Sequence, residues 1–156
     1  SHFMKIKLLD CTLRDGGYYN NWDFETDLVL DYLKAMDALQ VDFVEIGFRS
    51  LKNKVFKGGL AYSTDSFLNN LTIPVGLKNK IGVMINGSEI SDSKTQIKCL
   101  KKLFKPKAKS IVTLVRIACH VHEFNDCLPA SNWLNKQGYL VGFNIISQGN
   151  IAGIRF

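Results

Sequence analysis

Residues 8–19 read LLDCTLRDGGYY, and this stretch decides how the rest of the chain is interpreted. Apolar and polar side chains alternate from residue 6 to residue 13, which is the period of a β-strand. The pair Gly16-Gly17 is a turn signal that ends the strand. We therefore expect Arg14 and Asp15 side by side at its carboxyl end, which is where α/β folds bind their ligands.

The rest of the chain alternates between strand-like and helix-like segments. Apolar residues at helical spacing predict helices over residues 23–40, 91–104 and 125–136. Within residues 50–80 we expect a long loop followed by a short helix from about residue 63 or 64 to residue 70. Further strands are expected over residues 41–48, 80–86, 110–120 and 139–146. This alternation is typical of a parallel sheet with right-handed crossovers.

Each expected strand carries a polar side chain on the face predicted to point inward. These residues are Asp10, Glu45, Asn86, Arg116 and Asn144. Arg49 has the parity of Glu45 and is predicted to reach the mouth of the barrel. A barrel lumen explains the pattern more simply than an open sheet, and a complete barrel needs about 250 residues. The predicted fold class is therefore α/β, an incomplete TIM (β/α)8 barrel of about five parallel strands.

Composition predicts one ordinary globular domain over residues 4–156, with residues 1–3 as the remnant of a tag. The net charge of +6 comes from lysines at helical spacing, which favours solvated helix faces over a nucleic-acid surface. The four cysteines lack a C-x-x-C spacing, so we expect reduced thiols and a cytoplasmic protein. The sequence contains no apolar run of about 18 residues, so no membrane span is predicted.

Two motifs resemble those of a known superfamily. The L-R-D-G string at Leu13–Gly16 follows a D-x-T strand, and Glu45 begins an E-x-G-F string at the end of the second strand. Both are similar to the DRE-TIM metallolyases, which include hydroxymethylglutaryl-CoA lyase, 4-hydroxy-2-oxovalerate aldolase, isopropylmalate synthase and homocitrate synthase. The resemblance implies a metal-dependent aldolase or lyase that makes or breaks a carbon–carbon bond through an enolate.

The same resemblance implies roles for individual residues. Asp15 would ligate a divalent metal, magnesium or manganese or else zinc, and Arg14 would stabilise the enolate oxygen of a 2-oxo acid or acyl-type substrate. Glu45, Tyr18 and His120 are the candidates for proton transfer, in that order. Arg49 and Asn144 are assigned to substrate binding.

The sequence departs from the superfamily pattern at two points. The usual His-x-His metal ligands lie on the seventh strand, and the five predicted strands do not reach it; His120 and His122 have the same spacing, but His120 matches a histidine of the aldolases that is not a ligand. Tyr18 stands where the 4-hydroxy-2-oxovalerate aldolases have an acid–base histidine, and Gly17 stands where the lyases and synthases have Glu or Leu. The substrate is therefore expected to differ from theirs.

Two other functions fit the same residues. A half-barrel could bind a small carboxylate through Arg14 and Arg49 without catalysing a reaction. Alternatively, the exposed sheet edges of an incomplete barrel could pair with a second copy of the chain and form a homo-oligomer.

Overall fold

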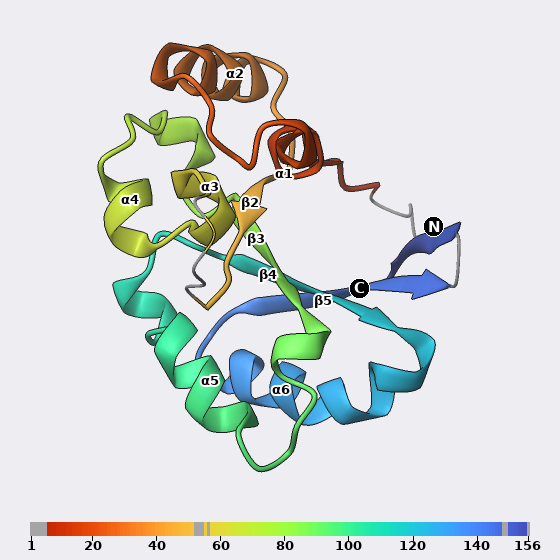
Figure 1. The fold of residues 1–156 in the computed structure, drawn as a ribbon. Coiled ribbons are helices and arrows are strands. Elements are labelled where there is room, and N and C mark those ends of the chain that lie inside the picture. Colours follow the sequence, from red (N-terminus) through yellow and green to blue (C-terminus); the bar gives the residue numbers. More distant parts are fainter. Residues whose placement is uncertain (1–5, 52–54, 56, 148–149, 156) are drawn as a thin grey trace, which may run out of the picture.

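The computed structural model describes residues 6–51, 55, 57–147 and 150–155, and it contains one curved six-stranded sheet (Figure 1). The strands are ordered β1 to β6 along the sheet; the first five pair in parallel and β6 pairs antiparallel with β5. Their bounds are Leu9–Asp10 (β1), Phe43–Phe48 (β2), Ile81–Asn86 (β3), Leu114–His120 (β4), Leu140–Ser147 (β5) and Asn150–Arg155 (β6). The five parallel strands and their helices form an incomplete α/β barrel, as predicted.

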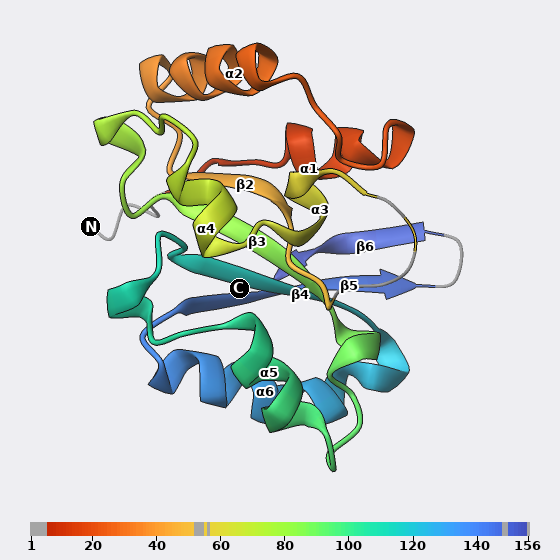
Figure 2. The ribbon, with the colours of Figure 1, turned by 60° about the vertical axis from the view of Figure 1, so that its left-hand side comes forward.

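The longer helices follow the strands as crossovers and lie on the outside of the curved sheet (Figure 2). The α-helices are Thr12–Gly16 (α1), Thr26–Ala38 (α2), Gly59–Tyr62 (α3), Asp65–Asn69 (α4), Gln96–Leu103 (α5) and Phe124–Lys136 (α6). Short 3-10 turns span Gly17–Tyr19, Val75–Leu77, Gly87–Glu89, Lys107–Lys109 and Val121–Glu123. Within the described ranges, no helix combines the length and the apolar content needed to cross a membrane.

The main core lies between the sheet and the helices outside it. Val44 in β2, Val83 in β3 and Val115 in β4 are fully buried there, and Leu33 and Leu134 meet them from α2 and α6. Alternate residues of each strand point to the opposite face of the sheet, which we call the inner face. The polar residues that follow these valines in the sequence, Glu45 after Val44 and Arg116 after Val115, therefore point to the inner face.

The first strand is much shorter than predicted. The alternating pattern predicted a strand to residue 13, but β1 ends at Asp10 and Arg14 lies in the helix α1. The Asp10 carboxylate accepts hydrogen bonds from the backbone N–H of Thr12 at 3.0 Å and from its hydroxyl at 3.2 Å. This local turn competes with an extended backbone and starts the helix.

A bulge in β2 changes the face to which its last residues point. Glu45 is paired with Gly82 and Gly47 with Val83, so Ile46 is an extra residue in the strand. The parity therefore reverses after Glu45, and Phe48 instead of Arg49 turns toward the inner face. The prediction that Arg49 reaches the mouth beside Glu45 is wrong for this reason.

The antiparallel strand β6 and the helix α3 were not predicted. Residues 147–150 were expected to form a loop after the last parallel strand, yet Ser147 pairs with Asn150 and Phe143 with Arg155. The strand β6 is therefore an edge of the sheet, opposite the two-residue edge β1. The helix α6 continues through Pro129, as the prediction over residues 125–136 required.

Candidate active site on the inner face

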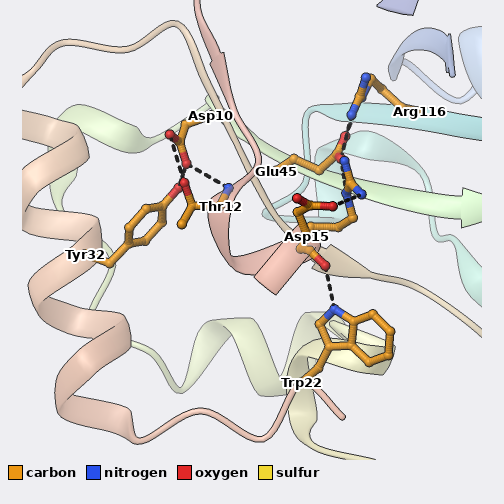
Figure 3. Close-up of polar contacts among 8 residues, drawn as sticks. Asp10, Thr12, Asp15, Trp22, Tyr32, Glu45 and Arg116 are labelled. Atoms are coloured by element: carbon orange, nitrogen blue, oxygen red, sulfur yellow. Dashed lines mark hydrogen bonds and ion pairs between the residues drawn. The ribbon is translucent and has the colours of Figure 1, made fainter. Parts of the chain in front are cut away.

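A buried carboxylate between two arginines forms the centre of the inner face (Figure 3). Glu45 is fully buried, and its Oε1 accepts from Arg14 Nε at 2.8 Å and from Arg116 Nη2 at 2.7 Å. Its Oε2 accepts from Arg116 Nε at 2.5 Å. Two cations thus share one anion away from water, which leaves this cluster with a net positive charge.

The backbone of α1 fixes Arg14 in this position. Trp22 Nε1 donates to the backbone carbonyl of Arg14 at 2.8 Å, and the indole is itself buried. A Cβ at Gly17 would come within 1.9 Å of the Trp22 ring, so the second glycine of the motif allows the indole to approach. Gly17 therefore serves packing as well as the end of the helix α1.

Aromatic rings surround the Arg14 guanidinium. Tyr18, Trp22 and Phe48 contact one another edge to face with ring centroids 4.8 to 6.0 Å apart, and the guanidinium carbon lies 5.9 Å from the Phe48 ring. Tyr18 is 62% exposed at the rim of this cluster. Partial burial raises the pKa of Tyr18, and the nearby Arg14 opposes the rise. The phenol is therefore protonated at neutral pH and can act as a proton donor.

Asp15 lies beside Arg14 but points to solvent. Its side chain is 68% exposed, and its Oδ1 accepts from Arg14 Nη1 at 3.4 Å. One carboxylate can supply one ligand to a divalent metal, but metal sites in proteins require several. The part of the chain that the structure describes contains no group of three His, Cys, Asp or Glu side chains that could hold a metal. The described residues therefore do not form a complete metal site.

Two polar atoms on the inner face are buried without a described partner. Arg116 Nη1 and Asn144 Oδ1 each have no hydrogen-bond partner among the described residues. Asn144 is paired with Ala118, so it lies one step diagonally from Arg116 on the inner face. Arg116 Nη1 can therefore still donate a hydrogen bond, and Asn144 Oδ1 can still accept one.

His120 lies farther along β4 than the arginine cluster. It is four residues beyond Arg116, roughly 13 Å along a strand, and its side chain is exposed. Its ring stacks on His122 with centroids 5.5 Å apart, and both line a cavity of about 490 Å³ together with Ile146. His120 shares the inner face with Arg116 but is not in contact range of Glu45.

Two predicted inward residues lie on the outer side of the sheet. Arg49 is buried there and donates to the carbonyls of Ser63 at 2.8 Å and Leu103 at 3.1 Å. Asp10 accepts from the Tyr32 hydroxyl of α2, because its pairing with Val44 turns it toward the helices (Figure 3). Burial and the Asp10 carboxylate both raise the pKa of Tyr32. The predictions that place these two side chains inward are wrong.

Comparison with known proteins gives one informative similarity. No protein-family model and no curated protein matches the chain. A solved structure described as the N-terminal domain of a "putative aldolase" from Bacteroides vulgatus is 31% identical, with a TM-score of 0.69. The similarity covers 90% of this chain and 44% of that one, so this chain spans less than half the length of its relative. The fold is that of an aldolase-like half-barrel.

Several residues of this inner-face site were not predicted from the sequence. Arg116 was predicted to point inward, but it was not recognised as the second partner of Glu45. Trp22 and Phe48 were not assigned to the site at all. The signals available were the strand parity of Arg116 and the aromatic residues in the loop that follows the glycine pair. The bulge that turns Phe48 inward leaves no clear mark in the sequence.

Proposed function

We propose that this chain carries the enolate-binding part of an aldolase-type carbon–carbon lyase that acts on a 2-oxo acid or an acyl-type substrate. The observation that supports it best is the buried cluster of Arg14, Glu45 and Arg116 on the inner face. The similarity to the N-terminal domain of a "putative aldolase" agrees with it. Placement among the DRE-TIM metallolyases is part of the same proposal.

In this proposal Arg14 stabilises negative charge as it develops on the substrate oxygen. Its guanidinium is held by Glu45 and lies beside the exposed carboxylate of Asp15, so it is oriented before the substrate arrives. A preorganised cation of this kind needs little rearrangement during the reaction. Both carboxylate oxygens of Glu45 already accept hydrogen bonds from arginines. We therefore assign Glu45 to positioning the arginines in place of the proton transfer predicted from sequence.

Proton transfer is assigned to Tyr18. Its side chain is 62% exposed at the edge of the aromatic cluster, and its phenol is protonated at neutral pH, so it has a proton to donate to the substrate. His120 is a second candidate, which would have to act on a part of the substrate that extends along β4. Asn144 would contact the substrate through the carbonyl oxygen that has no described partner.

The proposal also includes a divalent metal, and Asp15 is the residue that would bind it. This carboxylate could contribute one oxygen ligand, and the other ligands would have to come from outside the described residues. When bound, the metal would polarise the substrate carbonyl as a Lewis acid.

The experiment is a retro-aldol assay on the complete polypeptide. A 4-hydroxy-2-oxo acid is supplied with Mg²⁺ or Mn²⁺, and released pyruvate is measured with lactate dehydrogenase and NADH. Arg14→Met should lower kcat/KM by about 100- to 1000-fold, as the loss of an oxyanion donor does. Asp15→Asn should abolish turnover, while circular dichroism shows that both variants stay folded.

The matched control is Lys34→Ala, which removes an exposed charge from α2 and should leave kcat/KM unchanged. Full activity in both Arg14→Met and Asp15→Asn would place the active site elsewhere. Absence of pyruvate release from the unmodified protein with either metal would also contradict the proposal.

A non-catalytic carboxylate-binding half-barrel is the second candidate function. The observation that favours it is that Arg14 and Arg116 share a single carboxylate, which leaves a net positive charge on the inner face. Binding of a 2-oxo acid without turnover, and without any effect of divalent ions on the affinity, would support this function over the lyase.

A further inference from the structure

A cavity lined in part by charged side chains lies on the outside of the half-barrel, separate from the arginine cluster. Its volume is about 460 Å³, within the range of small-molecule sites. It lies beside α4 and the end of α5, two successive crossovers that Figure 2 shows outside the sheet. Arg49, Thr64, Asp65, Lys101, Lys102 and Lys105 are among the residues that line it.

The charges around this cavity are strongly unbalanced. Among the described residues, its lining includes four cationic side chains and a single carboxylate, that of Asp65. Asp65 Oδ1 accepts from Arg49 Nη2 at 3.3 Å and from the Ser110 hydroxyl at 2.6 Å, so this carboxylate is already compensated. The ammonium groups of Lys101, Lys102 and Lys105 form no ion pair with any described carboxylate. An entering anion would therefore meet three uncompensated cations.

Arg49 builds the wall of the cavity. It is 2% exposed and donates to the carbonyl of Ser63, just before α4, and to the carbonyl of Leu103, the last residue of α5. This contact covers a carbonyl at the negative end of the helix, which would otherwise repel an anion. Arg49 also stacks over the Phe104 ring, with 5.0 Å to the ring centroid. Arg49 thereby holds the segment before α4 and the end of α5 together.

A hydroxyl donor faces the same space. Thr64 Oγ1 accepts from the backbone N–H of Phe67 at 3.1 Å as the cap of α4, which leaves its own hydrogen available to donate. Ammonium groups bind phosphate as point charges, and a hydroxyl donor beside them can add a hydrogen bond to a phosphate oxygen. The one arginine here has its nitrogens engaged with protein oxygens.

We propose that this outer cavity binds a small phosphorylated anion through Lys101, Lys102 and Lys105, with Thr64 as a hydroxyl donor. The site is distinct from the proposed lyase site, because its lining residues belong to the outer side of the sheet. Its ligand could regulate the protein or be a substrate, and in either case the lysines provide the recognition.

The test is a titration of the 156-residue chain with inorganic pyrophosphate, followed through backbone amide signals in nuclear magnetic resonance spectra. We expect saturable shifts at residues 64–66 and 101–105. Replacing the three lysines together (Lys101→Ala, Lys102→Ala, Lys105→Ala) should weaken binding at least tenfold. The matched control removes three exposed lysines outside the cavity (Lys34→Ala, Lys94→Ala, Lys136→Ala) and should change the affinity less than twofold.

Three results would overturn the proposal. Equal weakening in the two triple variants would show diffuse charge attraction instead of a site. Citrate binding as tightly as pyrophosphate would show that phosphate is not the recognised group. Absence of saturable shifts at up to 10 mM pyrophosphate would show that the cavity is not an anion site. The lyase assay above depends on none of these outcomes.

Discussion

Glu45 is the residue on which the inner face depends. Its carboxylate compensates two guanidinium groups that are at most 9% exposed, Arg14 and Arg116. A buried ion pair of this kind adds little net stability compared with an apolar pair, but removal of one member leaves a charge unpaired at high cost. The residue is therefore indispensable to the fold even if it transfers no proton.

Glu45→Gln tests this dependence. Loss of the negative charge leaves two neighbouring buried cations, and we expect the free energy of unfolding to fall by about 3–5 kcal/mol. Asp15→Asn is the matched control, because that carboxylate is 68% exposed and should change stability by at most about 0.5 kcal/mol. Urea unfolding measures both. Equal stability of Glu45→Gln and the unmodified chain would contradict the buried triad.

The two glycines of the motif provide a second test at this scale. Gly17→Ala would push a Cβ into the Trp22 ring and should destabilise by about 1–3 kcal/mol. A Cβ at Gly16 would have its nearest neighbour 4.0 Å away, so Gly16→Ala should be neutral or stabilise by up to about 1 kcal/mol. Thermal unfolding separates the two variants. The reverse order would contradict the described position of Trp22.

At the scale of elements, the bounds of strands and helices could be predicted from the sequence wherever the spacing of apolar residues decided the structure. The strands β2 to β5 and the helices α2 and α6 lie within a few residues of their predicted bounds, because each has a long apolar face to bury. The errors arose where a local hydrogen bond or an extra residue overrides periodicity. The Asp10 turn shortens β1, and the bulge at Ile46 sends Arg49 outward.

The packing of β4 against α6 gives a test at the element scale. Cys119 of β4 and Cys127 of α6 are buried beside Gly87, and burial raises the pKa of Cys119 and raises that of Cys127 to about 12. Thiolates are the reactive form, so both should react slowly with 5,5′-dithiobis(2-nitrobenzoic acid) even at pH 9. The half-buried Cys11 and Cys99 should react first.

The number of cysteines that react measures which thiols are buried. We expect two of the four cysteines to be modified rapidly in the folded chain and all four in 8 M urea. Mass spectrometry of peptides identifies which two react. Rapid modification of Cys127 in the folded chain would show that α6 does not pack on β4 as described.

At the scale of the whole molecule, the inner face combines a charged centre with an apolar end. Near the amino ends of the strands, Leu9, Phe43, Leu114 and Leu140 line a cavity of about 540 Å³, and Leu140 is 50% exposed. The fold class follows from the alternation of strands and helices. The antiparallel β6 and the pairing of Arg116 with Glu45 do not follow from it, because both depend on contacts between distant segments.

In the proposed lyase, the arginine cluster of the inner face binds a planar anion that resembles an enolate. Oxalate mimics the enolate of pyruvate, and its titration into the 156-residue chain can be followed through backbone amide signals. We predict saturable shifts around Arg14, Glu45 and Arg116, and at least tenfold weaker binding in Arg14→Met. Shifts confined to the outer cavity at residues 64–66 and 101–105, or no saturable shift at all, would contradict the account.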